Sequence, residues 1–562
     1  GKLAELSAAV GDAPVGASTG IGHTRWATHG RPDERNAHPH LDCTGELAII
    51  HNGIIENHRD LRDSLEGSGH VFASDTDSEV LAHLIEREMA RGAGLSEAVR
   101  GVASAVEGAF ALAAIATSEP GLVVGARRVA PLVAGVSDGA AVLASDIPAV
   151  VGVTRDVVVV EDDQIVELRP GSLCVRGLDG EEVVPTRVRV EWGLAAAERS
   201  GFADFMLKEI HEQPRAVADT LAGRQERGGE LHLDELRLTE DELRAVDKIF
   251  IVGCGTSHHA GMVAKYAIEH WTRLPCEIEI ASEFRYRDPV LDARTLVVVV
   301  SQSGETADTL AAGRYARRWH APLVAICNVV DSSMARDADA VLYTHAGPEI
   351  GVAATKTHVA QVVAVELLAL YLAQVRGTVL PTEVTRLVDE LHEVPERIEQ
   401  VLRCSDQIRA LAEQFSATRD FFFLGRGVGY PVALEGALKL KEISYARAEG
   451  YPAGEMKHGP IALIEPGVVV VGVATRSRVH RKTLSNISEV RARGATVVLV
   501  ITEGDDEARA HADHVIEVPD TFELFAPAVD VVVLQLFAYW LAKARGHDVD
   551  KPRNLAKTVT VE

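Results

Sequence analysis

The chain has 562 residues, of which 47% are hydrophobic and 25% are charged, and its formal net charge is −25. A chain of this length exceeds a single hydrophobic core, so about two to four domains are expected. The acidic balance argues against nucleic acid and against an anionic membrane as partners, because both bind clustered cations. An anionic substrate must therefore be held by local dipoles and a few placed groups.

Cysteine usage and apolar runs indicate a reduced, cytoplasmic protein. The cysteines are scattered, with no CxxC pair and no metal-ligand spacing. The best apolar run, Ala526–Ala542, contains Asp530 and Gln535 and predicts a buried core helix rather than a membrane span. The chain shows no secretory signal and opens at Gly1 without a methionine, so its first residue need not be that of the gene product. The six cysteines are Cys43, Cys174, Cys254, Cys276, Cys327 and Cys404.

Residues 1–193 predict an α+β domain of antiparallel layers. Short apolar runs between turn residues indicate strands, and helical periodicity covers Asp77–Arg91. Residues 194–240 lack strand signals and predict a helical linker, in which Pro214 fits a first turn. Its charged helical stretches are Lys208–Gln213 and Asp234–Ala245. The predicted strands are Leu47–His51, Leu122–Gly125, Ala141–Ala144 and Val157–Glu161.

The rest of the chain predicts a duplicated α/β module, with repeats at 241–385 and 408–545 and a tail at 546–562. Continuous apolar strands alternate with helical stretches, which is typical of a doubly wound parallel sheet. Each strand of the second repeat follows its counterpart by about 172 to 174 residues. The paired strands are Ile249–Val252 and Phe421–Leu424, Leu296–Val300 and Val468–Val471, Leu323–Asn328 and Val497–Ile501, and Ala340–Thr344 and His514–Val518.

Two hydroxyl-rich turns follow neighbouring strands of the first repeat. Ser301-Gln302-Ser303-Gly304-Glu305-Thr306 precedes a helix, and hydroxyls with free N–H groups at a helix N-terminus suit a phosphate dianion. Helix capping is the simpler alternative, but the density of donors favours phosphate. Gly253-Cys254-Gly255-Thr256-Ser257 ends the first strand, either as a second part of that site or as a tight turn capped by Thr256. The second repeat lacks such hydroxyls, so the repeats are expected to differ in function.

Acid–base candidates lie in the second repeat and in the tail. Lys439 and Glu442 share one helix face and suit sugar enolisation, although a surface ion pair is the default for this spacing. His458, between glycines, is either a placeable acid or base or a plain loop residue. Lys557 lies in a terminal segment with structured character, and a lysine in a dry pocket forms Schiff bases with ketoses.

The front domain carries a candidate site of another kind. Arg25 suits a bidentate carboxylate contact. Asn52 and Gly53 suit an oxyanion hole, although Asn-Gly is more often a turn. Asp77 suits a substrate ammonium, with N-capping by Asp75 or Asp77 as the alternative.

These motifs together resemble the glutamine–fructose-6-phosphate aminotransferases, over nearly the whole chain and in order. The matching segments are HTRWATHG, HNGIIENH, FMLKEI, CGTS, SQSGET, LGRG, ALEGALKLKEISY, KHGP and PRNLAK. The resemblance implies an N-terminal-nucleophile glutaminase domain, truncated at its start, followed by two sugar isomerase (SIS) domains. It implies fructose 6-phosphate and L-glutamine as substrates, a homodimer, and no metal or organic cofactor.

The resemblance also assigns residues. Glu442 is similar to the base that moves a proton between C1 and C2, with Lys439 beside it. His458 is similar to the ring-opening residue, expected from a neighbouring subunit, and Lys557 to the Schiff-base lysine. Trp26 resembles the gate of an ammonia channel. The glutamine site comprises Arg25, Asn52, Gly53 and Asp77, and the sugar-phosphate site Thr256, Ser257, Ser301, Gln302, Ser303, Thr306, Val352 and Ala354.

Three departures from the family qualify these expectations. The family begins with a catalytic cysteine whose α-amine serves as base, and no such segment is present here, so this chain is expected to isomerise the sugar without hydrolysing glutamine. Ala354 and Thr558 stand where serine is usual. Two alternatives remain: an isomerase or deglycase without amide transfer, and a non-catalytic phosphosugar sensor. The apparent glutamine site argues against the first, and the acid–base residues argue against the second.

Overall fold

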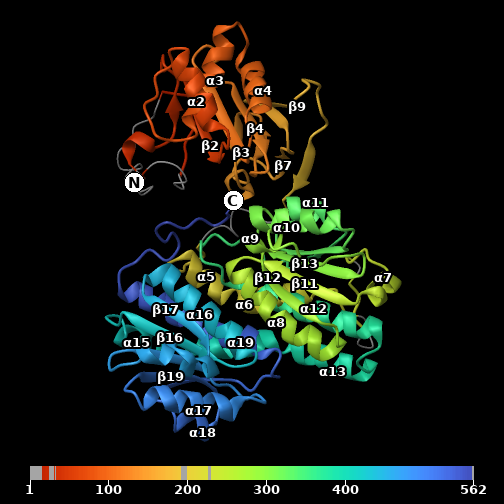
Figure 1. The fold of residues 1–562 in the computed structure, drawn as a ribbon, viewed down its shortest axis with the longest axis vertical. Helices are drawn as coiled ribbons and strands as arrows, with labels where there is room; N and C mark the ends of the chain where they lie inside the picture. Colours follow the sequence, from red (N-terminus) through yellow and green to blue (C-terminus); the bar gives the residue numbers. More distant parts are fainter. Residues whose placement is uncertain are drawn as a thin grey trace. The chain divides into compact units, whose positions relative to one another are not determined.

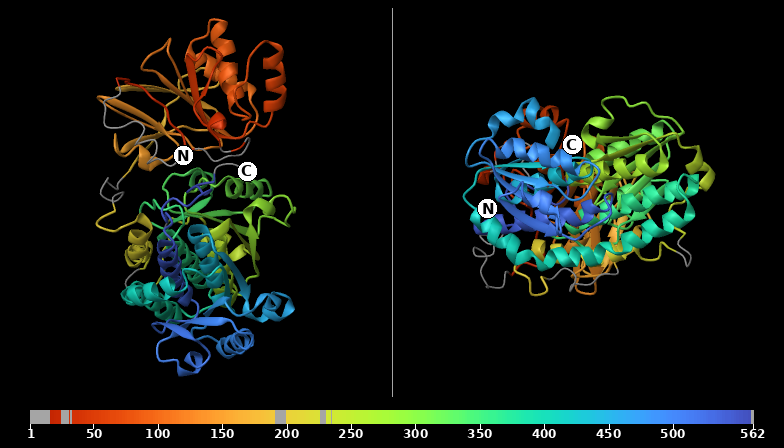
Figure 2. Two further views of the ribbon diagram at one scale, coloured as in Figure 1. Left: turned by 90° about the vertical axis from the view of Figure 1, so that its left-hand side faces the viewer. Right: turned by 90° about the horizontal axis from the view of Figure 1, so that it is seen from below.

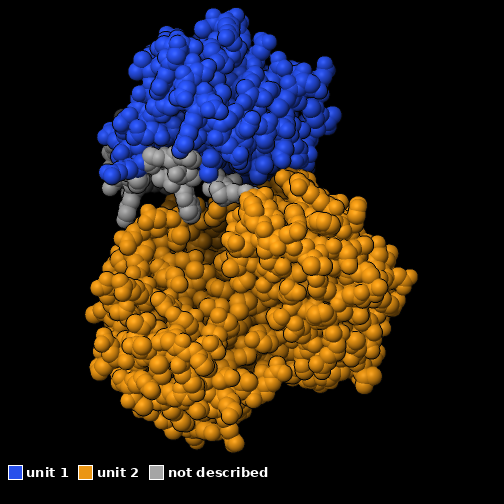
Figure 3. All heavy atoms as spheres, viewed as in Figure 1, with its two compact units in different colours: residues 1–193, 561 blue, residues 194–560, 562 orange. Residues whose placement is uncertain are grey.

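A computed structural model describes residues 16–24, 31, 33–190, 199–225, 230–233 and 235–559. The chain divides into two compact units, unit 1 within Gly1–Gly193 and unit 2 within Leu194–Thr560 (Figure 3). Both units keep their cysteines as free thiols, and all six cysteines lie in the described residues.

Unit 1 contains two antiparallel sheets, as the sequence predicts. The larger sheet has the order β1-β2-β3-β4-β8-β9 and the smaller has the order β10-β7-β5-β6. The strands of the larger sheet are β1 (His40–Leu41), β2 (Leu47–Gly53), β3 (Phe110–Ala116), β4 (Val123–Arg128), β8 (Gln164–Arg169) and β9 (Ser172–Gly177). Those of the smaller are β5 (Val133–Ser137), β6 (Ala140–Ala144), β7 (Asp156–Val159) and β10 (Thr186–Arg189).

Three helices cover the outer face of the larger sheet: α2 (His58–Gly67), α3 (Glu79–Ala90) and α4 (Leu95–Ala105). Strand β3 is nearly all buried because its two faces enter different cores. Phe110, Leu112 and Ala114 pack toward the helices, whereas Ala111 packs into a core shared with the smaller sheet. The unit is therefore layered, with helices on one sheet and that sheet on a second.

The first repeat of unit 2 is a five-stranded parallel sheet with the order β12-β11-β13-β14-β15. Its strands are β11 (Lys248–Gly253), β12 (Cys276–Ile280), β13 (Thr295–Ser301), β14 (Leu323–Cys327) and β15 (Ala340–Tyr343). Its helices are α8 (Gly255–Thr272), α9 (Ala281–Phe284), α10 (Ala307–Arg318), α11 (Ser333–Asp337) and α12 (Lys356–Arg376).

The second repeat has the corresponding order, β17-β16-β18-β19-β20, and this confirms the predicted duplication. Its strands are β16 (Asp420–Gly425), β17 (Arg447–Pro452), β18 (Val469–Val473), β19 (Thr496–Thr502) and β20 (His514–Val518). Its helices are α16 (Gly429–Ser444), α17 (His480–Arg491), α18 (Asp506–Arg509) and α19 (Ala526–Ala544), with 3₁₀ turns η4 (Ala453–His458) and η5 (Pro460–Leu463).

The two repeats share one hydrophobic core, because their central helices meet between the sheets. Helix α8 contacts α12 and α16, and α19 contacts α12 and α16 (Figures 1 and 2). Helices α12 and α19 are long and apolar enough to span a membrane, but 89% of the apolar window of each is buried inside the protein. The sequence predicts a buried core helix at Ala526–Ala542 because Asp530 and Gln535 interrupt its apolar run, and α19 is such a helix.

Linking helices pack on this core rather than standing apart from it. Helices α5 (Phe205–His211) and α6 (Gln213–Leu221) lead into the first repeat, with Pro214 in the first turn of α6. The expected helix at Asp234–Ala245 is shorter than predicted, since α7 covers Glu240–Ala245 and begins at a capping box of Thr239 and Glu242. Helices α13 (Pro381–His392), α14 (Val394–Arg403) and α15 (Ser405–Gln414) join the repeats.

Candidate active site

The strand order of the first repeat places β11 beside β13, where the connections leave toward opposite faces of the sheet. Ligands of doubly wound sheets bind at the carboxyl ends of the strands at this switch point. Gly253 ends β11 and Ser301 ends β13. The two hydroxyl-rich turns predicted from the sequence therefore lie at one edge of the sheet.

The turn from Ser301 to Thr306 is shaped by its own hydroxyls. Ser301 Oγ accepts a hydrogen bond from the Gly304 N–H at 3.1 Å and lies 2.9 Å from Thr306 Oγ1. Gly304 has φ +67°, and a Cβ there would lie 2.1 Å from Ser332 Oγ, so only glycine fits. Ser303 Oγ accepts from the Glu305 N–H at 3.1 Å. The turn thus presents hydroxyls and backbone N–H groups ahead of α10, as an anion site requires.

Thr256 belongs to a cluster that joins the repeats. It does not cap α8, whose N-cap residue is Cys254, so the capping interpretation is wrong. Its hydroxyl donates to Glu435 Oε1 at 3.1 Å and accepts from Lys439 Nζ at 3.1 Å. Lys439 Nζ also lies 2.6 Å from Glu442 Oε2. The end of β11 therefore meets the face of α16 that carries Glu435, Lys439 and Glu442.

Lys439 is not in a surface ion pair, because its side chain is 1% exposed and that of Glu435 is 0% exposed. Burial alone would lower the pKa of Lys439, but the carboxylates of Glu442 and Glu435 raise it above its ordinary value. Burial would likewise raise the pKa of Glu435, yet Lys439 and His358 hold it at about 2. Lys439 therefore remains an ammonium that fixes Glu442, whose side chain is 21% exposed.

Lys557 docks into unit 2 beside this cluster. Its Nζ donates to Glu349 Oε2, and to Gly351 O at 2.8 Å. Burial would raise the pKa of Glu349, but the Lys557 ammonium holds it at about 2. Glu349 is also among the carboxylates that raise the pKa of Lys439 against burial. The two lysines and their carboxylates thus form one electrostatic cluster.

The chain after α19 reaches both parts of this site. The Ala307 N–H, in the first turn of α10, donates to Val559 O at 3.2 Å. Asp550 accepts from the N–H groups of Phe205 and Met206 at 3.0 and 2.9 Å, and its carbonyl accepts from the Val352 N–H at 3.0 Å. Residues after the second repeat therefore line the first.

The remaining sugar-site candidates lie in the same region of unit 2. Gln302 is half-buried next to Ser301, and its carbonyl accepts from the Asn328 N–H at 3.1 Å. Ser257, in the first turn of α8, is half-buried, as is Ala354 just before α12. His458 differs, since it is exposed at the end of η4, and no contact among the described residues joins it to Glu442.

In unit 1, Asn52 and Gly53 form the last two positions of β2, paired with Ala111 and Phe110, so they are not a turn. Gly53 has φ +125°, and a Cβ there would lie 2.0 Å from the carbonyl oxygen of Ala109. Asn52 Oδ1 lies 2.5 Å from the ring Nε2 of His23. Position 53 therefore accepts only glycine, and the side-chain amide of Asn52 lies directly before it.

Asp77 does not cap α3, whose N-cap residue is Ser78, and neither does Asp75. Asp77 is 2% exposed, and its Oδ2 accepts from the Ile55 N–H at 2.9 Å. This bond ties the start of α3 to the segment that follows Asn52 and Gly53. Arg25 and Trp26 lie outside the described residues.

Sequence reasoning missed several buried partners. Glu435 precedes Lys439 by one helical turn, and that spacing was a usable signal. Glu349 and Glu209 offered none, because their partners come from distant segments. Glu209 accepts from the N–H groups of Ile350 and Gly351, and burial with Glu349 nearby raises its pKa to about 8.

Comparison with protein families finds the SIS domain at residues 242–371 and 414–545, and a glutamine amidotransferase domain at residues 23–152. A glutamine–fructose-6-phosphate aminotransferase [isomerizing] of Streptomyces coelicolor is 54% identical over 567 residues, covering 100% of this chain and 92% of the relative. One of Mycobacterium tuberculosis is 51% identical over 577 residues, with the same two coverages.

Among solved structures, the C-terminal domain of glucosamine-fructose-6-phosphate aminotransferase from Francisella tularensis matches with a TM-score of 0.61 and 41% identity. It covers 63% of this chain and 100% of its own. A putative phosphosugar isomerase from Silicibacter pomeroyi matches with a TM-score of 0.52 and 30% identity, covering 62% of this chain and 100% of its own.

Proposed function

The chain belongs to the isomerising glutamine–fructose-6-phosphate aminotransferases, and from this premise we propose that it converts fructose 6-phosphate to glucosamine 6-phosphate with glutamine as the amino donor. One observation indicates which residues could carry out this reaction. Lys557, Glu349, Lys439 and Glu442 form a single charged cluster beside Thr256, at the switch point of the first repeat.

We propose that the sugar phosphate binds at the carboxyl ends of β11 and β13. The hydroxyls of Ser301, Ser303 and Thr306, with nearby N–H groups, donate hydrogen bonds that stabilise the dianion without a cation. The wall of the site is completed by Gln302, Ser257, Val352 and Ala354. Thr256 links this wall to Lys439, from which its hydroxyl accepts a hydrogen bond. A neutral cradle suits a protein whose net charge is −25.

The chemistry is assigned to the charged cluster. Lys557 gives a proton to Glu349, and its free amine attacks the C2 carbonyl of the open sugar; loss of water gives a Schiff base. Ammonia then displaces Lys557 from C2, and Glu442 moves a proton from C1 to C2 as general base and acid. Lys439 stays protonated and orients Glu442, so it is a positioning residue. Glu349 holds Lys557 in the site before the sugar binds.

We assign the amide site to unit 1. Asn52 and Gly53 supply the oxyanion hole, Asp77 holds the ammonium of glutamine, Arg25 binds its carboxylate and Trp26 gates ammonia transfer. We further propose a homodimer, in which His458 of the partner subunit opens the sugar ring, since His458 is exposed and stands apart from Glu442 in one chain.

We also propose a cytoplasmic location, because the free thiols of all six cysteines fit a reducing compartment.

Borohydride trapping tests the central assignment. Incubation with fructose 6-phosphate and borohydride should attach one sugar to the chain, and peptide mapping should place it on Lys557. Lys557→Ala should abolish trapping and the glutamine-independent formation of glucose 6-phosphate. Lys551→Ala, which removes an exposed lysine of the same tail, is the matched control. Undiminished trapping by Lys557→Ala, or trapping lost equally in both variants, would refute the assignment.

A further inference from the structure

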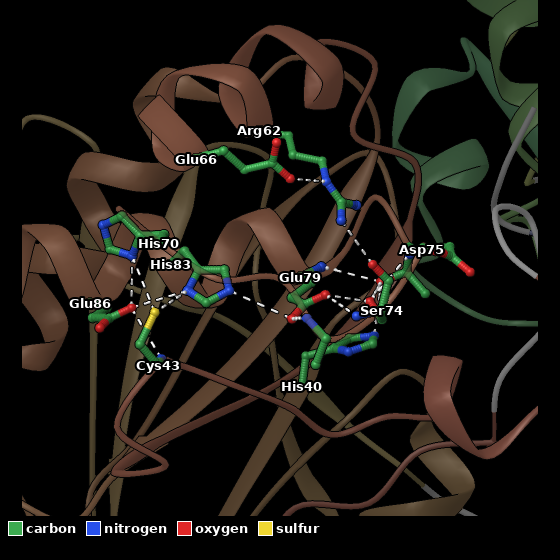
Figure 4. Close-up of polar contacts among 12 residues, drawn as sticks. His40, Cys43, Arg62, Glu66, His70, Ser74, Asp75, Glu79, His83 and Glu86 are labelled. Atoms are coloured by element: carbon green, nitrogen blue, oxygen red, sulfur yellow. Dashed lines mark hydrogen bonds and ion pairs between the residues drawn. The ribbon is translucent and has the colours of Figure 1, made fainter. Parts of the chain in front are cut away.

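Unit 1 brings together a cysteine, two histidines and a glutamate that are not part of the proposed glutamine site of Asn52, Gly53 and Asp77. Cys43 lies in the turn between β1 and β2, His70 in the loop after α2, and His83 and Glu86 on one face of α3. Their side chains turn toward a common point (Figure 4). Among the described residues, no other group of His, Cys, Asp or Glu side chains is spaced so that it could hold a metal ion.

The four ligand atoms lie close enough together to surround one metal ion, with the Cys43 contacts at tetrahedral zinc spacing and the Glu86 contacts shorter, at hydrogen-bond distance. Cys43 Sγ lies 3.6 Å from His70 Nδ1 and 3.5 Å from His83 Nδ1. Glu86 Oε2 lies 3.0 Å from each of the two Nδ1 atoms. No two of the four atoms are more than 4.8 Å apart. Zinc with bonds of about 2.0 to 2.3 Å separates its ligand atoms by roughly 3.3 to 3.6 Å.

A second carboxylate supports the orientation of His83. Its Nδ1 faces the cluster, and its Nε2 lies 3.6 Å from Glu79 Oε1. Glu79 in turn accepts from the N–H groups of Ala73 and Ser74 at 2.6 and 2.7 Å. A metal-bound imidazole whose other nitrogen faces a carboxylate is a recurring arrangement, because the carboxylate fixes the ring and its tautomer. The buried His83, 1% exposed, is therefore held in the orientation that ligation requires.

We propose that Cys43, His70, His83 and Glu86 bind one zinc ion. A thiolate with two imidazoles favours zinc over the hard cations Mg²⁺ and Ca²⁺, which prefer oxygen ligands. Four protein ligands leave no open position, so the ion is structural rather than catalytic. It cross-links the β1–β2 turn and the α2–α3 loop to α3. The ligands are spread between Cys43 and Glu86 without a regular spacing, which is why no motif reveals the site.

The ion would stabilise the part of unit 1 that carries Asp77. That residue precedes α3 by two positions, and Glu79 begins the helix. Fixing α3 through His83 and Glu86 fixes the position of its first turn as well. Zinc removal is therefore expected to lower the thermal stability of unit 1 and leave unit 2 unchanged.

Metal titration of the full chain tests the proposal. After dialysis against a chelator, zinc should bind with one ion per chain and nanomolar or tighter affinity in competition with a chromophoric chelator. Cobalt(II) should give the intense visible bands of a tetrahedral site and a thiolate-to-metal charge-transfer band. Cys43→Ser should remove the charge-transfer band and weaken zinc binding more than about 100-fold, and Glu79→Gln should weaken it about 10- to 100-fold.

Two further variants keep the test decisive if Cys43→Ser does not fold. His70→Asn replaces a partly exposed ligand and should also weaken zinc binding more than about 100-fold. Cys174→Ser removes a half-buried thiol of β9 outside the cluster and should leave zinc binding and the cobalt spectrum unchanged. Absence of stoichiometric binding at micromolar zinc would overturn the proposal. So would binding that persists in both Cys43→Ser and His70→Asn.

Discussion

The two repeats of unit 2 share a strand order but differ in what stands at the strand ends. In the first repeat, β13 is followed by the hydroxyl turn Ser301–Thr306. In the second, β18 is followed by Ala474 and Thr475, and its proposed acid–base groups instead lie on α16. The two repeats thus share a strand order but, in the proposed site, the first binds the phosphate and the second supplies the proton transfer.

The two repeats also differ in how a buried carboxylate outside the candidate site is held. Glu366 of α12 is 0% exposed, and neither carboxylate oxygen has a hydrogen-bond partner among the described residues, so burial raises its pKa well above the ordinary value. Asp530 of α19 is 2% exposed but accepts a hydrogen bond from Thr475 Oγ1 at 2.8 Å. Neither is paired with a cation in the described structure, unlike Glu435, which is held by Lys439.

The largest expected effect comes from the second repeat. Glu442→Gln keeps the shape of the side chain but removes the base beside Lys439, so isomerisation should slow about 10²- to 10⁴-fold while the KM for fructose 6-phosphate changes little. Steady-state kinetics of glucose 6-phosphate formation measures this split. Glu503→Gln changes an exposed carboxylate of the same repeat and should be neutral. A loss below tenfold would remove Glu442 from the chemistry.

A smaller effect is expected from Asp530→Asn, measured as stability against pH. Burial raises the pKa of Asp530 to about 7, and the Thr475 hydrogen bond offsets only part of this. A raised carboxyl pKa gives stability at low pH that is lost as pH rises from about 4 through about 7. Asparagine does not titrate. The free energy of unfolding of the variant should therefore equal that of the parent near pH 4 and exceed it by about 2 to 4 kcal/mol at pH 8.

Thermal unfolding of both proteins across this pH range supplies the measurement. The difference between their midpoints should grow with pH and level off above about pH 7. A constant difference at all pH values would mean that Asp530 is already ionised in the folded protein.

The smallest effect is expected at the phosphate turn. Ser303→Ala removes one hydroxyl from the first repeat and should raise the KM for fructose 6-phosphate about 10- to 150-fold, since a hydrogen bond to a charged group contributes about 1.5 to 3 kcal/mol. Ser477→Ala makes the matched change after β18 in the second repeat and should leave KM unaltered. Equal effects of the two variants would mean that both repeats bind the phosphate.

Much of the fold could be predicted because its strands are continuous apolar runs. The edge strands β12 and β17 escaped prediction for a physical reason: Cys276–Ile280 alternates apolar and acidic residues, and Arg447–Pro452 is largely polar. Strands at the edge of a sheet are less buried than central strands, so they tolerate more polar residues and give a weaker apolar signal.

Site residues were predictable where local chemistry marked them, as in Ser301–Thr306. Their partners were not, since burial of a charge depends on contacts across the chain. Lys557 and Glu349 are 208 positions apart, and Lys439 and Thr256 are 183 apart. Only the folded chain shows that Lys439 is buried and that Glu349, rather than solvent, receives Lys557.

The docking of the segment after α19 bears on how the protein is synthesised. Glu349 is fully buried, and a buried carboxylate without its partner costs about 3 to 5 kcal/mol. While a ribosome is still translating the second repeat, Glu349 therefore has hydrogen bonds from Thr355 and Thr357 but lacks its cationic partner. The Lys557–Glu349 contact can form only after Lys557 has emerged, about two hundred residues later. Because we propose Lys557 as the Schiff-base lysine, we expect a nascent chain to process sugar only after both repeats exist.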